Sequence, residues 1–341
     1  MTALHERWFI DSTPFPIHWS AALEPGALAA VGVAVGVVAV SAWVWRKAHR
    51  NPVVPGPAEL GAGPDSRAVL LGALPLILGL HLAIPLFVSG INLELFAPNL
   101  VLREAGSVPL QSPFAAIAAV GQIGIGLALF YGAFARPAAL ALLVLWLLGA
   151  VRFGPVLLLE HAIVPGTAAT LWITGRGPLA VDALLGHRFA RPARSRLRSA
   201  LTPLRIGTGL SLVTLALTEK LWNLPLGLAF LERYPVNFLP SLGIPLSDET
   251  FLLAAGTVEL TAGLLLLANV YVRLGILVPW LPFNITLAAF GWQELVGHLP
   301  IYGAMAALAI WGRGGAADVE SLERGLARRP TLAEAPPGSM A

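Results

Sequence analysis

Residues 251–273 form the apolar run that most constrains what this chain can fold into. The run is long enough to cross a bilayer as a helix, which takes about 20 residues. It nonetheless carries a carboxylate, Glu259, well inside its ends. A charged side chain near the centre of a membrane helix costs roughly 2.5–3.5 kcal/mol on insertion scales. Glu259 therefore requires either a partner group that compensates its charge or a functional role.

The composition supports a membrane protein. Hydrophobic residues make up 56% of the chain and charged residues 12%, whereas a soluble domain carries about 25% charged residues. The formal charge of +3 is small and the basic residues are spread over separate loops, which argues against a nucleic-acid partner. There is no cysteine, which excludes disulfides, thiolate metal ligands and thiol redox chemistry within this chain.

Nine stretches have the length and apolarity of transmembrane helices. They lie at about 27–45, 68–88, 114–134, 137–153, 156–173, 204–222, 250–270, 273–291 and 298–312. If the nine spans alternate in direction, 17 of the 22 Lys and Arg residues fall on one side of the bilayer, including Arg50, Arg188, Arg191 and Arg329, while Arg103 falls on the other. Because basic residues accumulate on the cytoplasmic side, this bias predicts an outside N-terminus and a cytoplasmic C-terminus.

The chain also contains an internal repeat. A shift of 137 residues aligns 67–177 with 204–314 without a gap, so that Arg136 matches Arg273 and His161 matches His298. Polar identities of this kind, in so apolar a chain, predict a tandem duplication. Each copy holds four spans, an even number, so the copies run in the same direction about an axis along the membrane normal.

The predicted fold is an all-α integral membrane protein with nine transmembrane helices, arranged as two parallel four-helix-bundle repeats plus one extra N-terminal helix. The predicted segments are an interfacial N-terminal region with the first helix and a linker at 1–66, a first repeat at 67–177, a basic cytoplasmic loop at 178–203, a second repeat at 204–314 and a cytoplasmic tail at 315–341. The tail has a short amphipathic stretch at 318–329, followed by an end that we expect to be disordered.

The second copy resembles the four-helix unit of the DoxX-like family of small membrane proteins. The matching residues are Arg205-Ile206-Gly207, Gly209-Leu210, Glu219-Lys220, Glu259-Leu260, Gly263-Leu264-Leu265-Leu266, Arg273, and His298 before Gly312. The first copy fits more loosely, with Ala83 in place of Lys220 and Gln122 in place of Glu259. The resemblance implies a bacterial inner-membrane protein associated with quinone-linked or thiol/sulfur redox systems, for example a thiosulfate:quinone oxidoreductase subunit.

Polar residues of the second copy gather near the outer ends of its spans. Glu259 lies nine residues from the start of its helix, roughly 13 Å deep. In a four-helix bundle such residues can converge on one outward-facing pocket. We assign catalytic roles to Glu259, Lys220 and His298. The candidate ligand-binding residues are Glu219, Asn284, Glu294, His161 and Gln122.

Each of these candidates also has a purely structural interpretation. Lys220 can snorkel to the interface, and Glu259 can pair with Lys220 or stay protonated and hydrogen-bonded. Glu294 and His298 are four residues apart and share a helix face unless position 294 lies in a loop. The histidines show no close-spaced ligand pattern, so no metal site is predicted.

Three functions are compatible with these features. The first is a redox-associated subunit that binds a quinone or similar lipophilic molecule and exchanges electrons with a partner protein on the outer face. The second is a non-catalytic anchor or assembly scaffold, which would bind its partner through the long outer loops 89–113 and 223–249. The third is a small-molecule transporter, which the parallel repeats permit. Against a transporter, only the helix with Pro279 and Pro282 shows a sign of interruption.

Overall fold

The computed structural model describes residues 6–48, 52–102, 112–186 and 194–328, and it is a bundle of helices with one small β-hairpin. The hairpin pairs β1 (Glu94–Leu95) with β2 (Ala97–Val101) in antiparallel fashion. Of the basic residues used to predict orientation, Arg50, Arg103, Arg188, Arg191 and Arg329 lie outside the described residues, as does the tail that we expected to be disordered.

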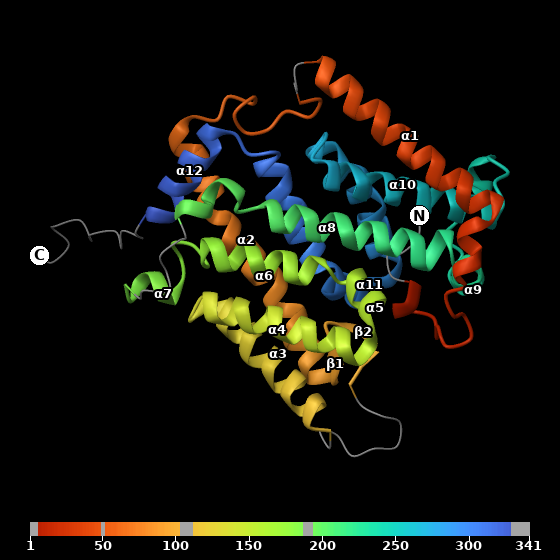
Figure 1. Cartoon of the computed structure of the whole chain (residues 1–341), viewed down its shortest axis with the longest axis horizontal. Helices are drawn as coiled ribbons and strands as arrows, with labels where there is room; N and C mark the ends of the chain where they lie inside the picture. Colours follow the sequence, from red (N-terminus) through yellow and green to blue (C-terminus); the bar gives the residue numbers. More distant parts are fainter. Residues whose placement is uncertain (1–5, 49–51, 103–111, 187–193, 329–341) are drawn as a thin grey trace, which may run out of the picture.

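The helices follow the predicted order along the chain (Figure 1). The first predicted repeat contains α2 (Pro64–Asn92), α3 (Pro113–Tyr131), α4 (Ala135–Phe153), α5 (Pro155–Glu160) and α6 (Ile163–Thr174). The second contains α8 (Thr202–Leu215), the π-helical turn η5 (Ala216–Leu221), α9 (Leu224–Arg233), the 3-10 turn η6 (Pro240–Leu242), α10 (Asp248–Ala268) and α11 (Val272–Trp311). Outside the repeats are η1 (Glu6–Trp8), η2 (Trp19–Leu23), α1 (Pro25–Lys47), α7 (Val181–Leu184), η4 (Arg194–Ser199) and α12 (Ala316–Ala327).

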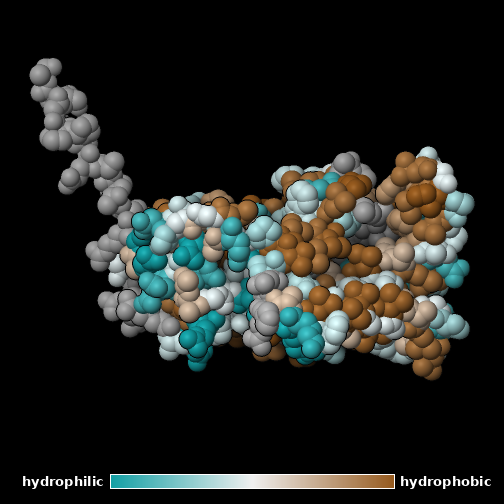
Figure 2. Space-filling model, turned by 90° about the horizontal axis from the view of Figure 1, so that it is seen from above, coloured by the Kyte–Doolittle hydropathy of each residue, from teal (hydrophilic) through white to brown (hydrophobic). Residues whose placement is uncertain are grey.

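Among the described residues, seven helices are long and apolar enough to cross a membrane. Two further apolar helices, 163–174 and 272–285, are shorter. Each predicted span overlaps one of these nine helices. The protein is therefore a multi-pass α-helical membrane protein, while the crossing of all nine helices stays a prediction. Figure 2 shows hydrophobic side chains over much of the body and hydrophilic ones gathered towards the left end of the view.

The interruption in the eighth predicted span is at a glycine and not at its prolines. Pro279 and Pro282 lie within the helical part of α11, whereas Gly291 has non-helical dihedral angles of φ 65° and ψ −135°. Only glycine adopts such angles readily, so Gly291 divides α11 into two helical halves. Glu294 is therefore on the second half and not in a loop, one helical turn before His298.

Local geometry recurs at the offset of 137 residues. The Arg136 side chain donates to the carbonyls of Trp172 and Ile173, and the Arg273 side chain donates to those of Ala309 and Ile310. The left-handed backbone at Phe134 (φ 53°) matches that at Tyr271 (φ 45°), and Gly154 (φ 88°) matches Gly291 (φ 65°). These equivalences support the predicted duplication.

Two arginines, Arg176 and Arg205, satisfy backbone carbonyls at helix ends. Arg176 is buried and donates to the carbonyls of Leu129 and Phe130 at the end of α3. At the equivalent carbonyls of α10, Leu266 and Leu267, the donor is instead Arg205. Each arginine satisfies carbonyls that the end of a helix leaves without a partner.

The two repeats meet where α6 packs on α8 and α2 packs on α11. Glycine permits the first contact, because a Cβ at Gly207 would lie 2.5 Å from the Ala162 carbonyl oxygen. A Cβ at Gly303 would lie 2.8 Å from the Cβ of His81. These close approaches bring the start of α6 beside the end of α8, where the candidate site lies.

The amphipathic stretch of the tail forms α12, which packs on α2 through Gly325 and Gly72. Arg67 on α2 pairs with Asp318 on α12 at 3.8 Å. Helix α12 therefore belongs to the folded body.

Candidate functional site

The N-terminal segment η1 inserts a buried arginine between the two repeats. Arg7 forms an ion pair with Glu160 at the end of α5 and lies 3.8 Å from Glu219 Oε1 on η5. Its Nη2 also donates to the Thr218 carbonyl at 3.0 Å, and the Thr218 hydroxyl donates to Glu160 Oε1 at 2.7 Å. Arg7 therefore connects the first repeat to the second from outside both.

A second ion pair continues the network into the second repeat. Lys220 Nζ lies 3.1 Å from Glu259 Oε2 on α10 and 3.8 Å from Glu6 Oε1. The Glu6 backbone N–H donates to Glu219 Oε2 at 2.5 Å. Lys220 is 1% exposed, so it does not snorkel, and it is the partner that Glu259 required.

The end of α8 presents both members of the Glu219-Lys220 pair to the interior. They are consecutive residues on the π-helical turn η5 and both are buried. A π-turn inserts a residue into a helix and redirects the side chains that follow, and such turns are frequent at functional sites. Gly256 lets η5 approach α10, since a Cβ there would lie 2.8 Å from the Leu221 side chain.

Among the residues that the structure describes, the network contains more carboxyl groups than cations. The carboxyl groups are Glu6, Glu160, Glu219 and Glu259, and the cations are Arg7 and Lys220. Each of the four carboxyl groups has at least one oxygen that is buried and accepts no hydrogen bond. Because an isolated buried carboxylate is costly, such a surplus favours the binding of protons. For Glu6, which lies outside the spanning helices, burial raises the pKa to about 7 against the opposing effect of Lys220.

Beside the network is a small cavity that both repeats line. Its polar wall holds Glu160, His161 and His298, and its aromatic wall holds Trp8 and Phe283. The cavity offers about 40 Å³ to the centres of water molecules, which is room for a few waters since one needs at least about 10–15 Å³.

Trp8 occupies the space that would otherwise enlarge this cavity. Its ring centroid lies 4.9 Å from that of His298, and a Cβ at Gly297 would lie 2.0 Å from its ring. Aromatic contacts hold the next residue as well, with the ring of Phe9 4.7 Å from Phe290 and 6.0 Å from Tyr234. Figure 1 shows the N-terminal segment at the end of the bundle near α5, α9 and α11.

The two histidines occupy matching positions. His161 Nδ1 is 3.0 Å from the Leu157 carbonyl oxygen, and His298 Nδ1 is 2.9 Å from that of Glu294. The Glu294 carboxylate also lies 3.4 Å from His298 Nδ1. The structure therefore brings His161, His298 and Glu294 to the edge of the site.

Two predicted ligand-binding residues are engaged elsewhere. Gln122 accepts from the Phe96 N–H at 2.9 Å and donates to the Glu94 carbonyl at 2.7 Å, so the β-hairpin uses both ends of its amide. Asn284 donates to the Trp280 carbonyl of its own helix at 2.7 Å and does not line the cavity. Both contacts favour structural roles for these two residues.

Sequence reasoning missed Glu6, Arg7 and Trp8 as members of the site. Their segment was interpreted as interfacial because aromatic residues and prolines alternate there. The available signal was the charged pair Glu6-Arg7 directly before two aromatic residues. Within the described residues, no group of three or more His, Asp or Glu is placed to hold a metal ion.

The chain matches no family model, no curated protein and no solved structure. The resemblance to the DoxX-like family therefore stays an expectation.

Proposed function

We propose that this chain is the proton-accepting membrane subunit of a redox system that uses a lipophilic molecule of the quinone class. The observation that carries the proposal is the surplus of buried carboxyl groups over cations, next to a cavity walled by two histidines. Oxidation of a quinol releases protons together with electrons. Buried carboxyl and imidazole groups suit the acceptance of these protons, because burial brings their pKa values towards neutrality.

In this proposal the residues of the chain move protons and a partner takes the electrons. His298 borders the cavity, and Glu259 lies close enough to His298 for their charges to interact. We propose that a proton accepted at His298 passes to Glu259 and from there to the carboxyl groups around Arg7 and Lys220. The chain has no thiol of its own, so we assign the electrons to a redox partner.

The lining fits a quinone ring in chemistry but not in volume. Histidines and flat aromatic faces suit a planar ring with polar oxygens, yet the cavity has room for only a few water molecules. The Trp8 indole fills the adjacent space against Gly297. A quinone ring can therefore enter this space only if the Trp8 side chain moves out of it. Trp8 is on the N-terminal segment, which lies outside both predicted repeats.

For localisation we propose the bacterial inner membrane, with the N-terminus outside and the C-terminus cytoplasmic. The support is the distribution of basic residues in the sequence. Figure 1 places α7 and α12 at one end of the bundle and the N-terminal segment at the opposite end. In this orientation the charged network is near the outer face, where the segment 223–249, which contains α9 and η6, can contact the partner protein.

Mass spectrometry of lipophilic molecules extracted from the gently purified protein tests the function. The matched variants are Glu259→Gln and Glu249→Gln, the latter an exposed carboxylate near the start of the same helix. We expect a quinone in the wild type and in Glu249→Gln, and its depletion in Glu259→Gln. Ordinary phospholipid alone in all three samples would overturn the proposal.

A second candidate function, a membrane scaffold, has one specific observation in its favour. The network cross-links the N-terminal segment to both repeats, as a device for rigidity would. A scaffold predicts a partner protein that co-purifies equally with the wild type and with Glu259→Gln. Loss of that partner in Glu259→Gln would contradict a purely structural role.

A further inference from the structure

Buried hydroxyl groups lie on α6 and α8, the helices through which the two predicted repeats meet. On α6 they belong to Thr167, Thr170 and Thr174, and on α8 to Thr208 and Ser211. All five residues are at most 4% exposed. Ser211 also lines the cavity beside the charged network, so these hydroxyl groups begin at the candidate site.

The hydroxyl groups of α6 share one side of their helix. At 3.6 residues per turn, positions 163, 167, 170 and 174 fall on a single stripe. The Ile163 backbone N–H, at the start of this stripe, donates to the Ser211 hydroxyl at 2.9 Å. From Ile163 to Thr174 the stripe extends about 17 Å at 1.5 Å per residue. It leads from the cavity towards the end of the bundle that holds α7 and α12 (Figure 1).

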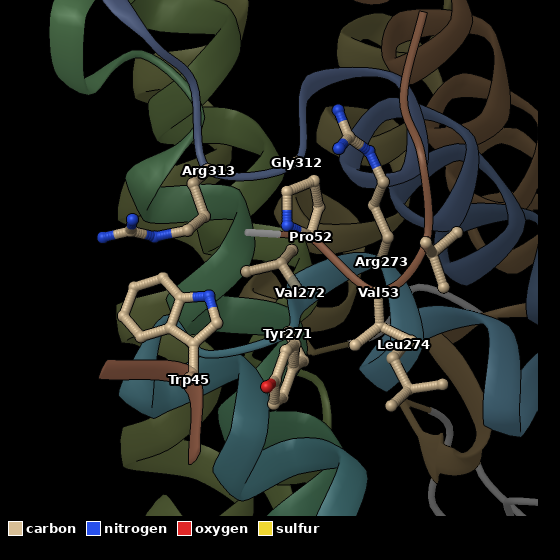
Figure 3. A pocket seen from close by; sticks show the side chains of 10 residues that line it. Trp45, Pro52, Val53, Tyr271, Val272, Arg273, Leu274, Gly312 and Arg313 are labelled. Carbon is tan, nitrogen blue, oxygen red and sulfur yellow. The ribbon is translucent and has the colours of Figure 1, made fainter. Parts of the chain in front are cut away.

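The stripe ends close to a polar surface. The Arg136 side chain is partly exposed and donates to the Trp172 and Ile173 carbonyls, directly before Thr174. Figure 3 shows Arg273, the matched residue of the second predicted repeat, beside a recess at the end of α11. Arg136 therefore brings partly exposed surface to within one helical turn of the last hydroxyl group.

Three of the hydroxyl groups differ from those of other threonines in the membrane helices. Thr257 and Thr261 of α10 each donate to the carbonyl one turn earlier in their own helix, at 2.6 and 2.7 Å. Among the described residues, by contrast, the hydroxyl oxygens of Thr167, Thr170 and Thr208 are buried and find no hydrogen-bond partner. Because buried polar groups are almost always hydrogen-bonded, to protein or to ordered water, these three hydroxyl groups point to bound water.

The fold does not need hydroxyl groups at these positions. At the offset of 137 residues all five are matched by buried apolar residues, which are Leu71, Leu74, Ala304, Ala307 and Trp311. The matched helices, α2 and α11, therefore pack without any of these hydroxyl groups. Buried polar groups that the scaffold does not require are candidates for a function.

We propose that Thr167, Thr170 and Thr208 hold internal water molecules between α6 and α8, and that this water carries protons between the cavity and the opposite end of the bundle. A hydroxyl group has one donor and two acceptor positions, so it can hold water on two sides. Successive hydroxyl groups of α6 are about 4.5–6 Å apart along the helix. One bridging water closes such a gap, since each hydrogen bond spans about 2.8 Å.

The transfer requires no other reactant. Each water molecule accepts a proton from one neighbour and passes another to the next, so no net bond forms or breaks along the line. The inference rests on the proposed function, to which it adds the route by which the accepted protons leave the charged network.

Radiolytic hydroxyl labelling with mass spectrometry tests for the water, because X-rays split bound water into radicals that oxidise the side chains beside it. The variant is Thr170→Val, which removes the hydroxyl group and nearly keeps the shape. The matched control is Thr261→Val, whose hydroxyl group is committed to the Thr257 carbonyl. We expect oxidation of buried residues of α6 and α8 in the wild type and in the control, and its loss from α6 in Thr170→Val.

Proton flux into proteoliposomes tests the transfer, with a potassium diffusion potential as the driving force and an enclosed pH dye as the readout. We expect a flux above that of protein-free liposomes for the wild type and for Thr261→Val. In Thr170→Val the flux should fall about fivefold, the effect of losing one hydrogen bond.

Three results would overturn the proposal: no oxidation of buried α6 and α8 residues in the wild type, a wild-type flux equal to that of protein-free liposomes, or unchanged labelling and flux in Thr170→Val. Should Thr170→Val fail to fold, Thr208→Val replaces it, and the labelling of the wild type decides if both fail.

The quinone content of the same preparations separates this inference from the proposed function. Quinone that is retained while the flux is absent overturns only the proton route. A flux that depends on Thr170 in a protein without quinone contradicts the proposed function and supports the hydrated line.

Discussion

The two predicted repeats differ at one matched position, which is Gln122 in the first and Glu259 in the second. Gln122 is neutral and the β-hairpin of its own repeat satisfies both ends of its amide. Glu259 is acidic and pairs with Lys220, which is alanine at the matched position, Ala83. The first repeat therefore satisfies this position with its own hairpin, whereas Lys220 and Glu219 of the second repeat also contact Glu6 and Arg7 of η1.

The comparison of the two predicted repeats distinguishes the features that both use for folding from those that the second alone carries. Away from this position the repeats use the same devices, as Arg136 and Arg273 show by donating to equivalent carbonyls. At this position one repeat keeps backbone hydrogen bonds and the other carries a charged network with unsatisfied oxygens. Buried charges that the scaffold does not need are functional candidates.

The largest effect is expected from removing the cation of the second repeat. Lys220→Ala leaves Glu259 and Glu6 buried without their shared partner, so we expect a loss of about 3–5 kcal/mol in the free energy of unfolding. The double variant Lys220→Ala/Glu259→Gln has the same two residues as the first repeat at the matched positions, Ala83 and Gln122, and should recover part of that loss. Chemical unfolding in detergent measures both variants. If the loss in the double variant equals the sum of the losses in the two single variants, Lys220 and Glu259 are not directly coupled.

Removing the cation that joins the repeats should be nearly as costly. Arg7→Met leaves Glu160 and Glu219 without a cation, and we expect a loss of about 3 kcal/mol. The N-terminal segment should also detach, which limited proteolysis before Pro25 reports. Arg152→Met, at an exposed position of α4, is the control and should remain resistant. Equal resistance of both variants would show that the aromatic contacts alone hold the segment.

A carboxylate placed in the first repeat tests the comparison from the other side. Gln122→Glu removes the donor to the Glu94 carbonyl and adds a buried acid with no lysine at position 83. We expect a loss of about 2 kcal/mol, typical of an unsatisfied buried polar group. Thermal unfolding measures it. An unchanged melting temperature would mean that the hairpin does not need the amide.

Per pH unit, the effect expected from Glu6 is smaller than that of the variants above. The folded pKa of Glu6 is about 7, above its ordinary value of 4.5, because of burial. The stability that comes from its proton is complete below pH 4.5 and is lost as the pH rises to about 7, at no more than about 1.4 kcal/mol per pH unit. Glu6→Gln should remove this slope from unfolding measurements between pH 4.5 and 7. Parallel curves for the two proteins would refute the assignment.

The sequence predicted those features that depend on local pattern. Apolar length located the helices, and the shared Arg136 and Arg273 revealed the offset at which local geometry recurs. The pairing of Lys220 with Glu259 was one of the alternatives that the cost of an isolated charge in a membrane helix indicated.

The rest of the site depends on contacts that no local pattern contains. The Glu6 backbone N–H donates to Glu219, which is 213 residues away in the sequence. The composition of the N-terminal segment, which is typical of a membrane interface, did not indicate that contact. The π-turn at Lys220 has the sequence of an ordinary helix end. The depth of a residue along a helix does not specify the direction in which its side chain points. Asn284 therefore lies at a plausible depth, but its side chain donates to the Trp280 carbonyl of its own helix.

Infrared spectroscopy of the protonated carboxyl band tests the central claim that the buried network holds a proton near neutral pH. The account predicts a band at pH 6 in the wild type that declines as the pH passes about 7 and that is reduced in Glu6→Gln. Such a result identifies a proton that the network can accept and release. Fully ionised carboxylates in the wild type at pH 6 would contradict the account and leave the network a structural tie between the two repeats.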